Sequence, residues 1–239
     1  MACKKTALVI GGTSGIGYAI AERFQQGGYD VAVTGVSQAG VEKFSGSDGI
    51  RAHRLDVADL PSIDQFFENV QELDVLVNCA GTNRRKGQEF NPETFEYVVR
   101  VNLLGTMRAC YAAYPIMKKT GGVIINIGSM FSSFGSGSIP AYASSKGAVV
   151  ALTRSLAIAW AGDGIRVNAI APGFIETKLT QDVLTTDRGR VDEVMSRTPM
   201  RRWGKPDDLS GTAYFLCSDE ASFITGATMT VDGGFSVYA

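Results

Sequence analysis

A tyrosine and a lysine lie four residues apart in the segment YASSK, residues 142–146. At that spacing the two side chains share one face of a helix, one turn apart. Pro140 lies just before them and suits the first turn of such a helix, where its missing N–H costs nothing. A phenol beside an ammonium could exchange protons with a substrate, although the pair alone is equally typical of a solvated helix surface.

His53 is the only histidine in the chain. A Ser-His-Asp hydrolase, a histidine-rich metal site or a histidine proton shuttle would have to use it. It lies in the strand-like segment GIRAHRLDV, where we expect a structural, partly buried residue. The acid and base of an enzyme must therefore come from other side chains, and we predict no metal site.

The composition is that of an ordinary globular protein. The 239 residues are 45% hydrophobic and 20% charged, with a net charge of -1, and nothing basic enough to bind nucleic acid or a membrane surface stands out. The longest apolar stretch, residues 147–162, is too short to span a bilayer and contains Arg154. The first residues lack the features of a signal peptide, and four scattered cysteines without CxxC pairing indicate reduced thiols. We therefore expect a cytoplasmic protein.

Short apolar segments alternate with amphipathic ones along the chain. The elements that they form must position Tyr142 and Lys146. Nearly continuous runs rich in Val and Ile are typical of strands buried on both faces, and they cover 6–11, 30–35, 50–57, 73–78, 121–128, 164–171 and 227–234. Helical patterns lie between them, for example at 17–27 and 61–72. This alternation predicts an α/β fold with a doubly wound parallel sheet of about seven strands and helices on both faces. No linker or repeat interrupts it, so we predict one domain over residues 1–239.

The first predicted strand runs into the loop GGTSGIG, in which Gly11, Gly15 and Gly17 are spaced G-x-x-x-G-x-G. Glycines allow a tight turn there and let the backbone approach a pyrophosphate, which the following helix N-terminus attracts. The position between a strand and a helix makes a dinucleotide site the favoured interpretation. The loop lacks the lysine of a phosphate-hydrolysing P-loop, which argues against an NTPase.

Over essentially its whole length, the sequence resembles the short-chain dehydrogenase/reductase family. GGTSGIG is similar to the family motif TGxxxGIG, with Ile10 in place of Thr, and NCAG is similar to NNAG, with Cys79 in place of the second Asn. The motifs that follow in family order are VNLLG with Asn102, Ser129 at the end of the fifth strand, YASSK thirteen residues later, APG at 171–173 and VDGG at 231–234.

The resemblance implies a Rossmann-fold oxidoreductase that uses NAD or NADP to interconvert a secondary alcohol and a ketone. Tyr142 would be the general acid/base. Lys146 would lower the Tyr142 pKa from its usual value of about 10 and hold the nicotinamide ribose. Ser129 would hold the reacting oxygen, and Asn102 would support a water relay from Lys146 to solvent.

The resemblance also implies cofactor contacts along the chain. Asp56 would contact the adenine amine or instead cap the turn that follows it, and Asn78 would tie the sheet backbone together beside the cofactor. The predicted cofactor-binding residues are Gly11, Thr13, Ser14, Gly15, Ile16, Gly17, Val36, Ser37, Asp56, Val57, Asn78, Ala80, Gly81, Tyr142, Lys146, Pro172, Gly173, Ile175 and Thr177.

The end of the second strand bears on the choice between NAD and NADP. Neither Val36 nor Ser37 offers the carboxylate that usually holds the ribose diol of NAD, and Ser14 stands where many NADP-dependent members carry Arg. Ser37 could bond either a hydroxyl or a phosphate. Because no cation is present to neutralise a 2′-phosphate, the sequence favours NAD, with NADP as the alternative.

A narrower resemblance connects the chain with sugar-acid members of the family, such as gluconate 5-dehydrogenases and 2-dehydro-3-deoxygluconate dehydrogenases. It rests on NCAGTNRRK, on SMFSS and on residues 196–209. An arginine of RRK could form a bidentate pair with a substrate carboxylate, although RRK could also be a solvated loop or a subunit contact. The candidate substrate residues are Arg84, Arg85, Met130, Phe131, Phe134 and Phe174. The last four of these side chains are apolar for a sugar-acid pocket, so other alcohols and ketones remain alternative substrates.

Two other functions are compatible with the same motifs. A 3-oxoacyl-carrier-protein reductase would use NADPH and carry a basic docking patch for its acidic partner. A non-catalytic cofactor sensor would typically have lost the Tyr or the Lys of YASSK, and both are present. The family resemblance also implies a homotetramer. Independently, residues 142–161 are apolar around more of the helix than one sheet face can cover, so packing against symmetry mates would bury the remainder.

Overall fold

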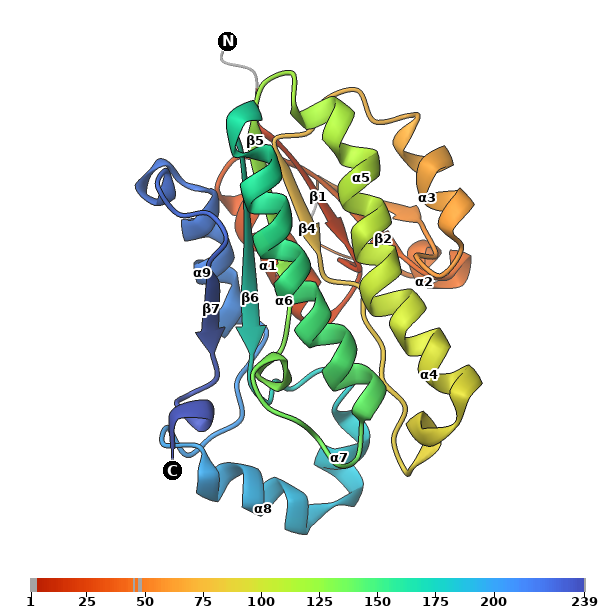
Figure 1. The fold of residues 1–239 in the computed structure, drawn as a ribbon, viewed down its shortest axis with the longest axis vertical. Coiled ribbons are helices and arrows are strands. Elements are labelled where there is room, and N and C mark those ends of the chain that lie inside the picture. The colour runs from red at the N-terminus through yellow and green to blue at the C-terminus, as the bar shows by residue number, and fades with distance from the viewer. Residues whose placement is uncertain (1–3, 45, 47–48, 239) are drawn as a thin grey trace.

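The computed structural model describes residues 4–44, 46 and 49–238. Within them, seven parallel strands form one sheet in the order β3-β2-β1-β4-β5-β6-β7 (Figure 1). The strands are β1 (Thr6–Ile10), β2 (Asp30–Gly35), β3 (Ile50–Arg54), β4 (Val75–Asn78), β5 (Gly122–Ile127), β6 (Ile165–Pro172) and β7 (Thr228–Val231). From β1 the chain adds strands first towards one edge of the sheet (β2, β3) and then towards the other (β4 to β7). The change of side falls between β1 and β4, and such sheets bind ligands at that point. The predicted doubly wound sheet is confirmed.

The central strands have cores on both of their faces. Successive residues of a strand point to opposite sides, so Leu8 and Leu76 join one core while their neighbours Val9 and Val77 join the other. Each of these four side chains is at most 3% exposed. Burial on both faces explains why the strands read as continuous apolar runs.

Helices form a layer on each side of the sheet (Figure 1). One core contains side chains of α1 and α9, and the other contains side chains of α3, α5 and α6. Beyond the carboxyl ends of the strands lie α7 and α8. The helices are α1 (Gly15–Gln26), α2 (Gln38–Glu42), α3 (Leu60–Phe67), α4 (Pro92–Val99), α5 (Gly105–Met117), α6 (Pro140–Trp160), α7 (Gln181–Thr186), α8 (Arg188–Arg197) and α9 (Asp207–Cys217).

Two local predictions were wrong. His53 lies in β3 as expected but is exposed rather than partly buried, because β3 is an edge strand; its ring lies 6.0 Å from that of Phe66 between centroids, in an edge-to-face arrangement. The helix predicted over 61–72 ends at Phe67. There the Asn69 side chain donates to the carbonyl of Gln65, and the backbone tightens so that Val70 N–H donates to the carbonyl of Phe67.

Cys79, Cys110 and Cys217 are free thiols, and Cys3 lies outside the described residues. No helix in the described ranges is long and apolar enough to cross a membrane.

Candidate active site

Tyr142 and Lys146 lie on the first turns of α6, which begins at Pro140 as predicted. Lys146 is 4% exposed, and its Nζ donates to the carbonyl of Ile127 over 2.6 Å. The same Nζ lies 5.8 Å from the centroid of the Tyr142 ring. Burial lowers the pKa of Lys146 to about 8, so this amine changes charge close to neutral pH.

Ser129 follows β5 and lies beside the Tyr142 phenol. Its Oγ accepts the N–H of Phe131 over 3.2 Å, which holds the serine at the start of a short 3₁₀ turn. Burial raises the pKa of Tyr142, while a hydrogen bond with Ser129 and the charge of Arg85 act to lower it. Burial, rather than Lys146, therefore dominates the pKa of this phenol in the structure.

Asn102 lies in a π-helical turn (Arg100–Leu104) between α4 and α5 and is fully buried. Its Oδ1 accepts the N–H of Thr82 over 2.8 Å, and its Nδ2 donates to the carbonyl of Thr82 and to Ser145 Oγ, both over 2.9 Å. Asn102 thus ties the loop after β4 to α6. Its role in a water relay stays a prediction. We call Asn102, Ser129, Tyr142 and Lys146 the polar corner.

Two polar residues that bond to this corner were not predicted from the sequence. Ser145 is 1% exposed and donates to the carbonyl of Tyr142 over 2.7 Å. Glu89 is fully buried and accepts the N–H of Tyr142 over 2.9 Å. Ser145 stands inside YASSK and could have been suspected there, whereas no motif points to Glu89.

The glycine-rich loop packs tightly against the loop after β4. Gly11 has a φ of +79°, and a Cβ there would lie 2.7 Å from Ala80 N. A Cβ on Gly17 would lie 2.4 Å from the carbonyl oxygen of Gly11. Only glycine allows this close approach. Beside it runs a groove of about 480 Å³, which we call the glycine groove.

Most of the predicted cofactor residues line the glycine groove. They are Gly11, Thr13, Ser14, Gly15, Ile16, Val36, Asp56, Val57, Ala80, Gly81 and Thr177. Thr177, from far along the chain, closes on Gly15: its Cγ2 lies 3.3 Å from where a Cβ of Gly15 would be. Asp56 also caps the turn that follows it, because its Oδ1 accepts the N–H of Ala58. Cys79, Tyr97 and Lys178 line the groove without having been predicted.

The remaining predicted cofactor residues lie outside the groove lining. Ser37 Oγ accepts the N–H of Gly40 and caps α2, and Ile175 is buried in the core. Asn78 Nδ2 donates to Asn126 Oδ1 over 2.9 Å, so it joins side chains of β4 and β5 and not their backbones. Gly17, Pro172 and Gly173 also lie outside the lining, as do Tyr142 and Lys146 of the polar corner.

The groove fits a nicotinamide dinucleotide. At its inner end Gly81 faces the polar corner, where a Cβ would lie 3.5 Å from both Lys146 Nζ and Asn102 Oδ1, so the absent side chain leaves that approach open. Gly15, with a φ of +58°, is the first residue of α1 and lines the groove. The N-terminus of α1 therefore lies at the groove, where it favours a pyrophosphate. Of the described residues that line it, Asp56 and Lys178 carry charge.

A second cavity, of about 800 Å³, lies between α7, α8 and the loop after β5, beyond the carboxyl ends of the strands. We call it the aromatic cavity. The described side chains that line it include Arg85, Lys86, Phe131, Phe134, Asp182, Asp187, Arg190, Arg197 and Phe235. The ring of Phe131 lies 6.5 Å from that of Tyr142, which connects the cavity to the polar corner.

The two neighbouring arginines behave differently. Arg84 Nη1 donates to Thr82 Oγ1 over 2.6 Å and to the carbonyl of Asn83 over 2.9 Å, so this side chain is used inside its own loop. Arg85 lines the aromatic cavity, and its buried Nε has no hydrogen-bond partner among the described residues. Lys86 follows with a φ of +57°, an unusual value for a residue with a side chain.

Of the four apolar candidate substrate residues, two line the aromatic cavity and two do not. Phe131 and Phe134 line the aromatic cavity, whereas Met130 is 2% exposed and does not. Phe174 does not line the cavity, but its ring packs against those of Phe131 and Trp203.

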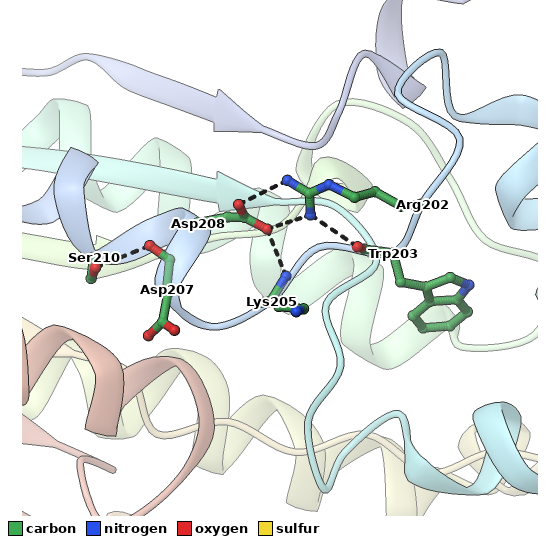
Figure 2. Close-up of polar contacts among 6 residues, drawn as sticks. All are labelled: Arg202, Trp203, Lys205, Asp207, Asp208 and Ser210. Atoms are coloured by element: carbon green, nitrogen blue, oxygen red, sulfur yellow. Dashed lines mark hydrogen bonds and ion pairs between the residues drawn. The ribbon is translucent and has the colours of Figure 1, made fainter.

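An ion pair anchors the segment that carries α7 and α8. Figure 2 shows the Arg202 guanidinium forming a fork with Asp208 at the start of α9, with N–O distances of 2.7 and 2.9 Å. Arg202 also donates to the carbonyl of Trp203, and Asp208 accepts the N–H of Lys205. The hydrogen bond from Arg202 lowers the pKa of Asp208 to about 2.

Comparisons with known proteins agree with this geometry. A family model described as "Enoyl-(Acyl carrier protein) reductase" matches residues 11–236. A 2-dehydro-3-deoxy-D-gluconate 5-dehydrogenase of Bacillus subtilis (strain 168) is 39% identical over 97% of this chain and 94% of its own. A tropinone reductase homolog of Datura stramonium is 34% identical over 97% and 92%. The crystal structure of a gluconate 5-dehydrogenase from Burkholderia cenocepacia J2315, in complex with NADP and tartrate, is 33% identical with a TM-score of 0.89, over 98% of this chain and 96% of that one.

Proposed function

The chain belongs to the short-chain dehydrogenase/reductase family, and from that premise we propose that it interconverts a secondary alcohol and a ketone of a sugar acid. It is an NAD(P)-dependent oxidoreductase. The observation that carries the proposal is a polar corner lying between a dinucleotide groove and a cavity that presents an arginine with an unpartnered Nε.

In the proposed mechanism Tyr142 gives a proton to the substrate oxygen, or takes one from it, while Ser129 holds that oxygen by a hydrogen bond. The bound nicotinamide would supply or accept the hydride. Burial raises the Tyr142 pKa, and a protonated Lys146 would act against that rise by stabilising the phenolate electrostatically. The residues proposed to hold the dinucleotide are those that line the glycine groove, together with Tyr142 and Lys146.

We infer that NAD is preferred over NADP. Val36 is 63% exposed at the groove and carries no charge, and Ser37 already caps α2. Val36→Asp should therefore sharpen the preference for NAD, since a carboxylate binds the ribose diol and repels a 2′-phosphate, whereas Ser14→Arg should favour NADP. The ratio of kcat/KM with the two cofactors measures both effects. Unchanged ratios in both variants would mean that the adenosine ribose lies elsewhere.

Arg85 is proposed to bind the substrate carboxylate. A guanidinium forms paired hydrogen bonds with a carboxylate, and buried guanidinium N–H groups need acceptors. The names of two relatives include gluconate or a gluconate derivative, which agrees with a sugar acid. Phe131 and Phe134 would then contact the carbon chain.

The decisive experiment is a substrate panel. The purified protein is mixed with NAD or NADP and polyols, aldonates, 3-hydroxyacyl thioesters or neutral secondary alcohols, and absorbance is followed at the nicotinamide band. We expect the highest kcat/KM on an aldonate or deoxyaldonate. Highest activity on a hydroxyacyl thioester with NADP would instead support a 3-oxoacyl-carrier-protein reductase.

We propose a homotetramer of two-fold symmetry and, from the sequence, one domain over residues 1–239 in the cytoplasm. Ile158 on α6 is 83% exposed and Tyr111 on α5 is 56% exposed, and packing these helices against symmetry mates would bury both. Light scattering at micromolar concentration tests this: a monomer would refute it.

A further inference from the structure

Glu89 is the one acidic residue buried among those that the structure describes. Its carboxylate lies between two backbone donors: Oε1 accepts the N–H of Arg84 over 2.7 Å, and Oε2 accepts the N–H of Tyr142 over 2.9 Å. Burying a charge costs free energy unless both oxygens are hydrogen-bonded. The two bonds join the loop of the arginines directly to the helix of the catalytic tyrosine.

The bond to Tyr142 takes the place of a helix cap. Tyr142 is the third residue of α6, so its N–H has no acceptor within the helix, and Ile139 at the N-cap position provides no side-chain bond. A negative charge at this helix end is also favourable. Glu89 supplies both from 53 residues away in the sequence.

The other end of the same residue is held as well. The carbonyl of Tyr142 accepts from Ser145 Oγ, which accepts from Asn102 Nδ2, and Asn102 holds both the N–H and the carbonyl of Thr82. The Tyr142 N–H is therefore bonded to Glu89, which also holds Arg84, and the Tyr142 carbonyl is linked through Ser145 to Asn102, which holds Thr82. Arg85 comes directly after that segment.

We propose that Glu89 is a positioning residue that fixes the Tyr142 phenol relative to Arg85, and so the distance between proton transfer and the recognised carboxylate. The role of Arg85 rests on the proposed function. The two hydrogen bonds of Glu89 to Arg84 and Tyr142, which we call the clamp, do not. Glu89 would thus act on the reaction through Tyr142 without touching the substrate.

Charge gives a second, separable effect. The titratable and charged groups that face the phenol are Cys79, Arg85, Glu89 and Lys146, and the charge of Glu89 raises the Tyr142 pKa. Neutralising Glu89 should therefore move the pH dependence set by Tyr142 to lower pH. Shortening Glu89 while keeping its charge should leave that dependence in place.

The test compares Glu89→Gln, which keeps the size but loses one acceptor and the charge, with Glu89→Asp, which keeps the charge but is too short to reach both donors. Glu93→Gln, at an exposed position on α4, is the matched control. In the free protein we expect faster amide hydrogen exchange at Arg84 and Tyr142 in both Glu89 variants. In turnover we expect kcat to fall about tenfold or more in both, the KM for cofactor to stay constant, and the pH profile to shift only in Glu89→Gln.

Unchanged amide exchange would show that the clamp is not present in solution and would overturn the proposal. Faster exchange with wild-type kcat and an unshifted profile would reduce Glu89 to a structural tie and would also overturn it. The exchange measurement needs no substrate, so it separates this proposal from the proposed function. If the panel yields a neutral substrate, a loss of kcat on that substrate still supports the positioning of Tyr142, and only the carboxylate role of Arg85 fails.

Discussion

The polar corner and the aromatic cavity meet at Phe131 and Arg85, but they are held in different ways. In the corner, Lys146 Nζ, both side-chain ends of Asn102 and both ends of the Tyr142 backbone have hydrogen-bond partners over 2.6–2.9 Å. In the cavity, ring contacts dominate: Phe131 packs on Phe134 with centroids 5.4 Å apart, and Arg197 lies over the ring of Phe235.

The difference separates what is fixed from what can vary. Directional hydrogen bonds that join α6 to β5, to the π-helical turn and to Glu89 hold the corner rigidly, so the chemistry of proton transfer is set by the fold. Ring packing tolerates changes of shape better than a buried hydrogen-bond network does. Substitutions in the corner should therefore affect kcat, and substitutions in the cavity should affect the choice of substrate.

Tyr142→Phe should produce the largest effect. The ring remains, but the exchangeable proton is lost, and the lone histidine lies in β3, outside the polar corner. We expect kcat to fall by roughly 10²–10⁴-fold, while the Kd for the cofactor changes little. Retention of most wild-type turnover, measured at the nicotinamide band, would contradict the role of Tyr142.

Arg85→Ala should act mainly on the cavity side. Losing a charge-assisted hydrogen bond of about 1.5–3 kcal/mol should raise the KM for a carboxylate substrate tenfold or more. Activity on a neutral analogue should change far less, because there the variant loses only the charge that lowers the Tyr142 pKa. Arg84→Ala is the matched control, because that side chain bonds within its own loop and does not line the cavity. Equal losses on both substrates would mean that Arg85 shapes the loop instead of binding charge.

Lys146→Met should reveal what the rigid corner costs in stability. The folded pKa of about 8 lies below the unfolded value of about 10.4, so the unfolded chain holds the proton more tightly and the wild type gains stability as pH rises between these values. The variant lacks this dependence. Its stability relative to wild type should therefore fall on the order of 2–3 kcal/mol between pH 7 and pH 10.5.

Urea unfolding at the two pH values measures that difference, and the hydrogen bond lost to Ile127 cancels in the comparison. Arg154→Met, at an exposed position of the same helix, should show no such pH dependence. A relative stability that stays constant would mean that the Lys146 pKa is not lowered.

The sequence predicted the parts of the site that depend on local spacing. Tyr142 and Lys146 share a helix face because they are four residues apart. Gly11 and Gly15 adopt positive φ where the chain must turn. The sheet followed from apolar runs that burial on both faces requires.

Other features depend on tertiary contacts that spacing does not encode. Glu89 meets Tyr142 across 53 residues, and nothing in the loop sequence indicates that meeting. Arg84 and Arg85 are chemically identical neighbours, so only the path of the backbone decides which one lines the cavity. Met130 follows Ser129 directly, yet the 3₁₀ turn directs it into the core.

The smallest expected effect concerns the anchor of the cavity segment, Arg202 with Asp208 (Figure 2). The side chains are 46% and 33% exposed, so solvent screening limits the pair to about 0.2–1 kcal/mol. Because the Asp208 pKa is lowered to about 2, this stabilisation is complete above about pH 5 and is lost as the pH falls through about 2. Asp208→Asn should therefore unfold at a slightly lower temperature than wild type at pH 7, and the gap should close on acidification. Since the pair holds the segment of α7 and α8 and not the polar corner, the variant should raise the substrate KM more than it lowers kcat; the reverse would show that the corner depends on the cavity after all.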